Sequence, residues 1–65
     1  MKGTKAQRRL LKAAEALQNA AEFFVAAAGG TEVAVIEATN LLEAAAWDFA
    51  VASIRVVQDA RHEGL

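Results

Sequence analysis

Apolar side chains recur at intervals of seven residues in two separate stretches of the chain. The first set is Leu10, Leu17 and Phe24, and the second is Val35, Leu42, Phe49 and Val56. Such a repeat places each set on one face of an α-helix. Proline is absent, and the abundant alanine, leucine, glutamate and arginine all favour helix. The pattern therefore predicts an all-α protein with helices over about residues 5–28 and 32–62.

The pair Gly29-Gly30 separates the two predicted helices. Glycine suits the position just after a helix, where a left-handed backbone is common, and Thr31 suits the N-cap of the next helix. Thr4 and Gln7 have the spacing of a capping box at the start of the first helix. We therefore expect a turn at residues 29–31 and one antiparallel helical-hairpin domain over residues 1–65. Folding back at this turn sets the two apolar stripes level with each other.

The second predicted helix carries a further apolar stripe on a different face. Its members are Val33, Ile36, Trp47, Val51 and Ile54. A hairpin offers no cover for this face, although fully burying such side chains is worth roughly 1.5–3 kcal/mol each. A two-helix hairpin of this size also buries too little surface to be stable alone. We therefore expect self-association, most simply a dimeric four-helix bundle and otherwise a higher homo-oligomer. The alternative is that the stripe docks on a different protein.

Two aromatic residues are candidate contacts in this interface. Trp47 is the only tryptophan and is the expected anchor. Phe23 does not belong to the heptad set of the first helix, Leu10, Leu17 and Phe24, and it is expected to pack on a neighbouring subunit.

Basic residues gather at the start of the chain. Five of the seven lie within the first 12 residues, although the formal net charge is −1. In a hairpin this end lies beside the end of the second helix, so one pole is basic, while the turn pole is acidic. A basic pole can hold the phosphates of RNA, DNA or a nucleotide; it can also serve only solubility and assembly. The candidate phosphate-binding residues are Lys5, Arg8, Arg9, Lys12 and Arg61.

Composition argues against several classes of protein. A hydrophobic content of 55% argues against disorder, and the absence of cysteine excludes a disulfide scaffold and a thiol nucleophile. His62 is the only histidine, and Ser53 is expected to be packed within a helix, so no catalytic or metal-binding constellation appears. We expect no enzymatic activity, no cofactor and no metal. No apolar run reaches the roughly 18 residues of a membrane span, which leads us to expect a cytoplasmic protein without a membrane partner.

Two resemblances suggest functions. The size and the two-helix layout resemble the Rop family of plasmid RNA-binding proteins, which implies a dimeric four-helix bundle that binds RNA. Ala38, Leu42, Glu43, Ala45 and Trp47 are similar to a run in the second helix of phage helical-hairpin sponges, with the tryptophan one position away. Those sponges sequester cyclic nucleotides from CBASS-type defence, so the second resemblance implies a phosphorylated small ligand.

The sequence thus favours a non-enzymatic, homo-oligomeric hairpin that sequesters or blocks a partner, as small phage or plasmid accessory proteins do. A protein, a nucleic acid and a phosphorylated small molecule all remain open as that partner.

Overall fold

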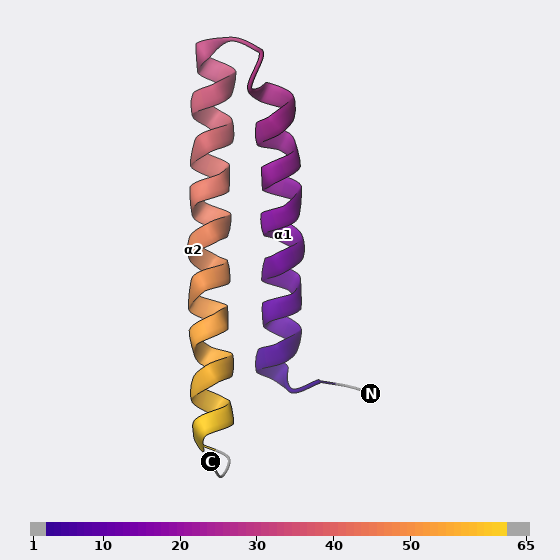
Figure 1. Cartoon of the computed structure of the whole chain (residues 1–65), viewed down its shortest axis with the longest axis vertical. Helices are drawn as coiled ribbons and strands as arrows, with labels where there is room; N and C mark the ends of the chain where they lie inside the picture. The colour runs from indigo at the N-terminus through magenta and orange to yellow at the C-terminus, as the bar shows by residue number, and fades with distance from the viewer. Residues whose placement is uncertain (1–2, 63–65) are drawn as a thin grey trace.

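The computed structural model describes residues 3–62, which form two antiparallel α-helices joined by a short turn (Figure 1). Helix α1 spans Lys5–Ala27 and helix α2 spans Glu32–His62. The molecule measures 50 × 21 × 12 Å, and its smallest dimension is about the diameter of one helix, 10–12 Å. The predicted all-α antiparallel hairpin is therefore confirmed, and it is a single layer with both broad faces open.

Side-chain caps fix where both helices begin. The Thr4 hydroxyl accepts a hydrogen bond from the Gln7 backbone N–H at 3.1 Å, and the Gln7 side-chain oxygen accepts one from the Thr4 N–H at 2.9 Å. This reciprocal pair is the predicted capping box. At α2, the Thr31 hydroxyl accepts from the Ala34 N–H at 3.1 Å, which confirms Thr31 as an N-cap.

The turn differs from the expected left-handed one. Neither Gly29 nor Gly30 has a φ between +20° and +160°, so the left-handed prediction is wrong. Helix α1 ends at Ala27, one residue earlier than expected, and Ala28 caps it with helical angles of −60° and −29°. The Ala28 N–H donates to the Val25 carbonyl at 3.3 Å, and the Gly30 N–H donates to the Ala27 carbonyl at 2.9 Å. In both hydrogen bonds the donor lies three residues after the acceptor, as in a 3₁₀-helix. They tighten the last turn of α1 and satisfy terminal carbonyls that a left-handed cap would otherwise satisfy.

Small residues occupy the closest contacts between the two helices. The buried apolar residues of the described chain are Ala38 at 0% exposure, Ala52 at 3% and Ala6 at 9%. The two heptad sets form the seam between the helices, and all seven of their residues are half-buried: Leu10, Leu17, Phe24, Val35, Leu42, Phe49 and Val56. Within residues 3–62, no large side chain is fully buried. A single layer can cover only the inner edge of a leucine or phenylalanine, so the seam faces the other helix and still meets solvent.

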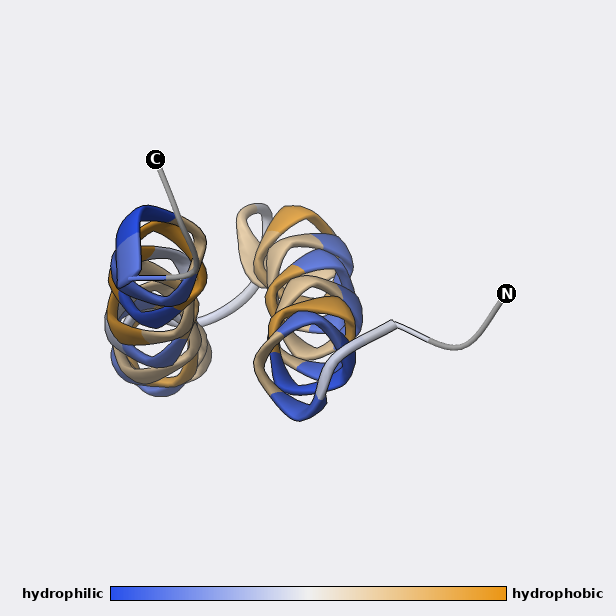
Figure 2. Cartoon of the chain, turned by 90° about the horizontal axis from the view of Figure 1, so that it is seen from below, coloured by the Kyte–Doolittle hydropathy of each residue, from blue (hydrophilic) through white to orange (hydrophobic). Residues whose placement is uncertain are grey.

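Apolar segments also lie on the outer side of α2, away from α1 (Figure 2). Neither helix offers a stretch of the length and hydrophobicity needed to cross a membrane, as far as the described residues reach.

Candidate functional site

Helix α2 exposes the predicted second stripe on the face opposite α1. At about 100° per residue, Val33, Ile36, Trp47, Val51 and Ile54 lie roughly 180° around the helix from buried Ala38. All five are exposed, from 46% for Val51 to 71% for Trp47. We call these five residues the outer stripe. Its position explains its exposure, because α1 lies on the other side of α2; only Trp47 and Val51 reach the edge of the side that faces α1.

Phe23 does not join the outer stripe. It lies on α1 and is 51% exposed, on the side of that helix that also carries Lys5 and Lys12 by helical spacing. Four further large apolar side chains are exposed outside the outer stripe. Val57 borders the stripe on the helical wheel, whereas the heptad pattern did not identify Leu11, Val25 and Leu41 as contacts. A helical wheel places these apolar residues away from the contact between the two helices, and this placement would have predicted their exposure.

Four of the predicted phosphate-binding residues are close together on α1. Lys5, Arg8, Arg9 and Lys12 line one shallow groove together with Leu11 and Glu15. The Arg8 guanidinium also donates to the Gly3 carbonyl at 2.9 Å, which holds it against the start of the helix. The cations occupy two turns of one helix, so their positive charge is concentrated there.

Arg61 lies apart from these four cations. It lines a largely apolar groove on α2 with Ser53, Ile54, Val57 and Gln58. The structure therefore divides the predicted phosphate-binding set between two surfaces.

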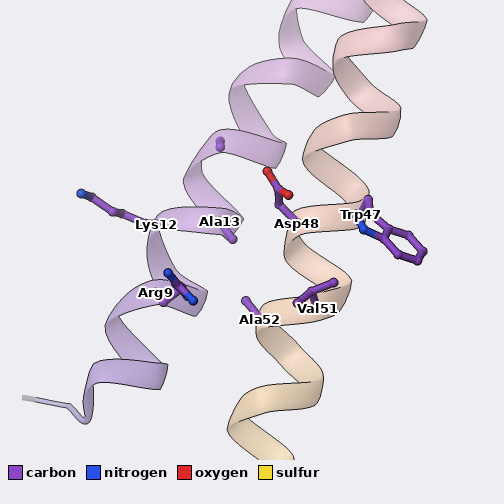
Figure 3. A pocket seen from close by; sticks show the side chains of 8 residues that line it. Arg9, Lys12, Ala13, Trp47, Asp48, Val51 and Ala52 are labelled. Atoms are coloured by element: carbon purple, nitrogen blue, oxygen red, sulfur yellow. The ribbon is translucent and has the colours of Figure 1, made fainter.

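A further groove lies between the helices, and Trp47 lines it together with two of the cations. Arg9 and Lys12 from α1 line it with Trp47, Asp48 and Val51 from α2, over a floor of alanines (Figure 3). The Asp48 carboxylate lies towards α1, whereas Lys12 and Trp47 point away from each other (Figure 3). A phosphate in this groove would meet a carboxylate as well as cations. The groove was not predicted, because it depends on how far each helix is rotated towards the other.

Nearer the open end, the same side of the hairpin carries mixed charge. Lys5 and Arg9 of α1 line a small groove with Arg55 and Asp59 of α2. Each of the two grooves contains one acid, Asp59 here and Glu15 in the groove on α1, but the groove on α1 has four cations against three and is therefore the more basic.

The hydroxyls of α2 are used within the helix. The Ser53 hydroxyl donates to the Phe49 carbonyl at 2.9 Å and the Thr39 hydroxyl donates to the Val35 carbonyl at 2.8 Å. Ser53 is half-buried, as expected for a serine packed in a helix, whereas His62 is exposed at the end of α2. Across residues 3–62, no three histidine, aspartate or glutamate side chains gather closely enough to hold a metal ion.

Comparison with protein-family models, with curated proteins and with solved structures finds no match to this chain.

Proposed function

We propose that the chain is a non-enzymatic, cytoplasmic protein that assembles with copies of itself and acts by binding, and so sequestering or blocking, a partner. The observation that carries the proposal is the distribution of exposure along the hairpin. Across residues 3–62, ten large apolar side chains are exposed, while only alanines are buried. A fold with this distribution gains most of its apolar burial from contacts with other chains.

The size of the gain fits an assembly of two hairpins. The five residues of the outer stripe are roughly half to two-thirds exposed, so covering them is worth on the order of 5 kcal/mol per chain. Two chains together gain about 10 kcal/mol, which is comparable with the cost of about 4–15 kcal/mol for losing free translation and rotation. A dimer of two hairpins is therefore the simplest assembly that we propose. Because the outer stripe faces away from α1, pairing through it places the four helices side by side, with the α1 helices outermost, instead of around the common core of a four-helix bundle.

Light scattering coupled to size-exclusion chromatography tests the assembly. We expect the chain to elute with a mass of two or more copies of 6.9 kDa. Trp47→Glu places a charge in the outer stripe and should reduce the mass to one copy. Leu41→Glu introduces the same charge at a residue that is 54% exposed but outside the stripe, and it should leave the mass unchanged. A wild-type mass of one copy at micromolar concentration would contradict the proposal.

A protein partner is supported by the apolar residues outside the outer stripe. Leu11, Phe23, Val25 and Leu41 remain exposed when only the outer stripe is covered. Contiguous apolar patches are characteristic of protein-binding surfaces, so these residues are the candidate contacts for such a partner.

RNA or DNA binding is the second candidate function, and the groove of four cations on α1 favours it. Affinity for a short DNA duplex should then fall steeply as salt rises. Changing Lys5, Arg8, Arg9 and Lys12 to glutamine should flatten the slope of log affinity against log salt by about 0.9 for each phosphate that the variant no longer neutralises. An affinity that does not change with salt would remove this candidate.

A phosphorylated small ligand, such as a cyclic nucleotide, is supported only by the groove that Arg9, Lys12 and Trp47 line together. If a cyclic dinucleotide binds there, it should raise the melting temperature in proportion to the logarithm of its concentration. Asp48→Asn should strengthen that effect, because it removes the carboxylate that faces the phosphates. If the cyclic dinucleotide changes the melting temperature of neither the wild type nor Asp48→Asn, this candidate is removed.

A further inference from the structure

The outer stripe and the exposed residues between its two halves have a spacing that reads the same from either end. From the first apolar residue of the stripe to the last, the exposed positions along this face of α2 are Val33, Ile36, Asn40, Glu43, Ala44, Trp47, Val51 and Ile54; beyond Ile54 the same face continues with the polar residues Gln58, Arg61 and His62. The steps between them are three, four and three, then one, then three, four and three. Each position therefore has a counterpart equally far from the midpoint between Glu43 and Ala44.

The row also runs straight along the helix. Val33 and Val51 lie 18 residues apart, as do Ile36 and Ile54, and at about 3.6 residues per turn this separation is five turns. Both pairs thus return to the same angle, so the row does not wind around α2. A second straight helix can lie along its whole length.

We propose that two copies pair through this row, with their α2 helices antiparallel around a two-fold axis at the midpoint between Glu43 and Ala44. The proposal rests on the self-association put forward above and specifies its surface, direction and register. In this arrangement Val33 packs against Ile54 of the partner subunit. Ile36 packs against the partner's Val51. The interface is isologous, because each contact occurs twice.

The polar members of the row have suitable places in this register. Trp47 lies opposite Asn40 of the partner subunit, so the indole N–H can donate to the amide oxygen when both become buried. Ala44 lies beside the axis, where a small side chain allows close approach of the two helices. Glu43 also lies beside the axis, next to Glu43 of the partner subunit, at the rim of the contact where both carboxylates keep their hydration.

Charge favours the antiparallel direction over the parallel one. On α2 itself, the turn end carries Glu32 and Glu37, and the open end carries Arg55 and Arg61 with Asp59 between them. The cations of α1 lie on the far side of α2, more than a screening length from the contact. Antiparallel pairing brings the acidic end of one copy near the basic end of the other. Parallel pairing would bring like charges together, and these repel within a screening length of about 8 Å at physiological salt.

Single-cysteine variants test this arrangement directly, because the described chain has no cysteine of its own. Two Ala44→Cys copies should form a disulfide-linked dimer under mild oxidation, since the axis brings position 44 next to itself. Val33→Cys alone should not link to itself, but mixed with Ile54→Cys it should link rapidly. Gln18→Cys lies on exposed α1 and is the control that should remain unlinked.

Each other result would overturn this arrangement in a different way. Self-linking of Val33→Cys would mean parallel pairing, and faster linking of Val33→Cys with Val57→Cys than with Ile54→Cys would mean a register shifted by about one turn. Linking through Gln18→Cys instead of Ala44→Cys would mean that copies pair through α1. If the wild-type mass is a dimer and Ala44→Cys does not link, the arrangement fails while the proposed self-association is kept. A monomeric wild-type mass removes both.

Discussion

Gly29 and Gly30 are neighbours in the turn, but their surroundings differ. A Cβ added at Gly29 would meet no atom within 4 Å, whereas one at Gly30 would lie 3.3 Å from the Ala27 carbonyl oxygen. Neither residue adopts the positive φ that only glycine accepts easily. The second glycine is therefore explained by close approach of the chain to the end of α1, and the first one is replaceable.

Alanine at the two positions should have different effects on stability. We expect Gly29→Ala to stabilise the fold by about 0.4–1 kcal/mol, because alanine restricts the unfolded chain without strain in the folded one. Gly30→Ala should gain less or lose stability, because its Cβ presses on the Ala27 carbonyl. Urea unfolding of both variants at one protein concentration measures the difference. Equal stability of the two would contradict this account of the turn.

At the scale of the helices, contact between α1 and α2 depends on small side chains. Ala38 is completely buried and Ala52 nearly so, which lets the helices approach closely while the larger seam residues flank the contact. The heptad spacing predicted which faces meet, because helical period alone fixes which residues share a face. It did not predict that alanines would be the most buried residues. That outcome depends on the distance between the helices, which the spacing does not determine.

Ala38→Leu should separate the helices. The extra side chain has no space at a fully buried position, so we expect a loss of about 1–3 kcal/mol of stability. Ala26→Leu makes the same substitution at an exposed position of α1 and should change stability by no more than about 0.5 kcal/mol. Denaturant unfolding monitored by circular dichroism gives both values, and an unchanged midpoint for Ala38→Leu would mean that the helix contact is looser than the structure has it.

For the whole molecule, the sequence was sufficient to predict the hairpin and the exposed outer stripe. Both follow from the position of each residue around its own helix. The groove between Arg9 and Trp47 and the separation of Arg61 from the other cations were not predictable in this way. They depend on how the helices are rotated and how their ends align, which are properties of the pair of helices.

Folding and assembly should be coupled, because each chain leaves its large apolar side chains exposed until a partner covers them. For a dimer, a tenfold rise in protein concentration contributes about 1.4 kcal/mol to stability. Unfolding entropy is about 2.1 cal/mol/K per residue, so the melting temperature of two 65-residue chains should rise by about 5 °C for each tenfold step. Trp47→Glu should melt at a lower temperature that does not depend on concentration. A wild-type melting temperature that is constant over two decades of concentration would mean that the hairpin is stable on its own, and that its exposed apolar residues serve some contact other than self-association.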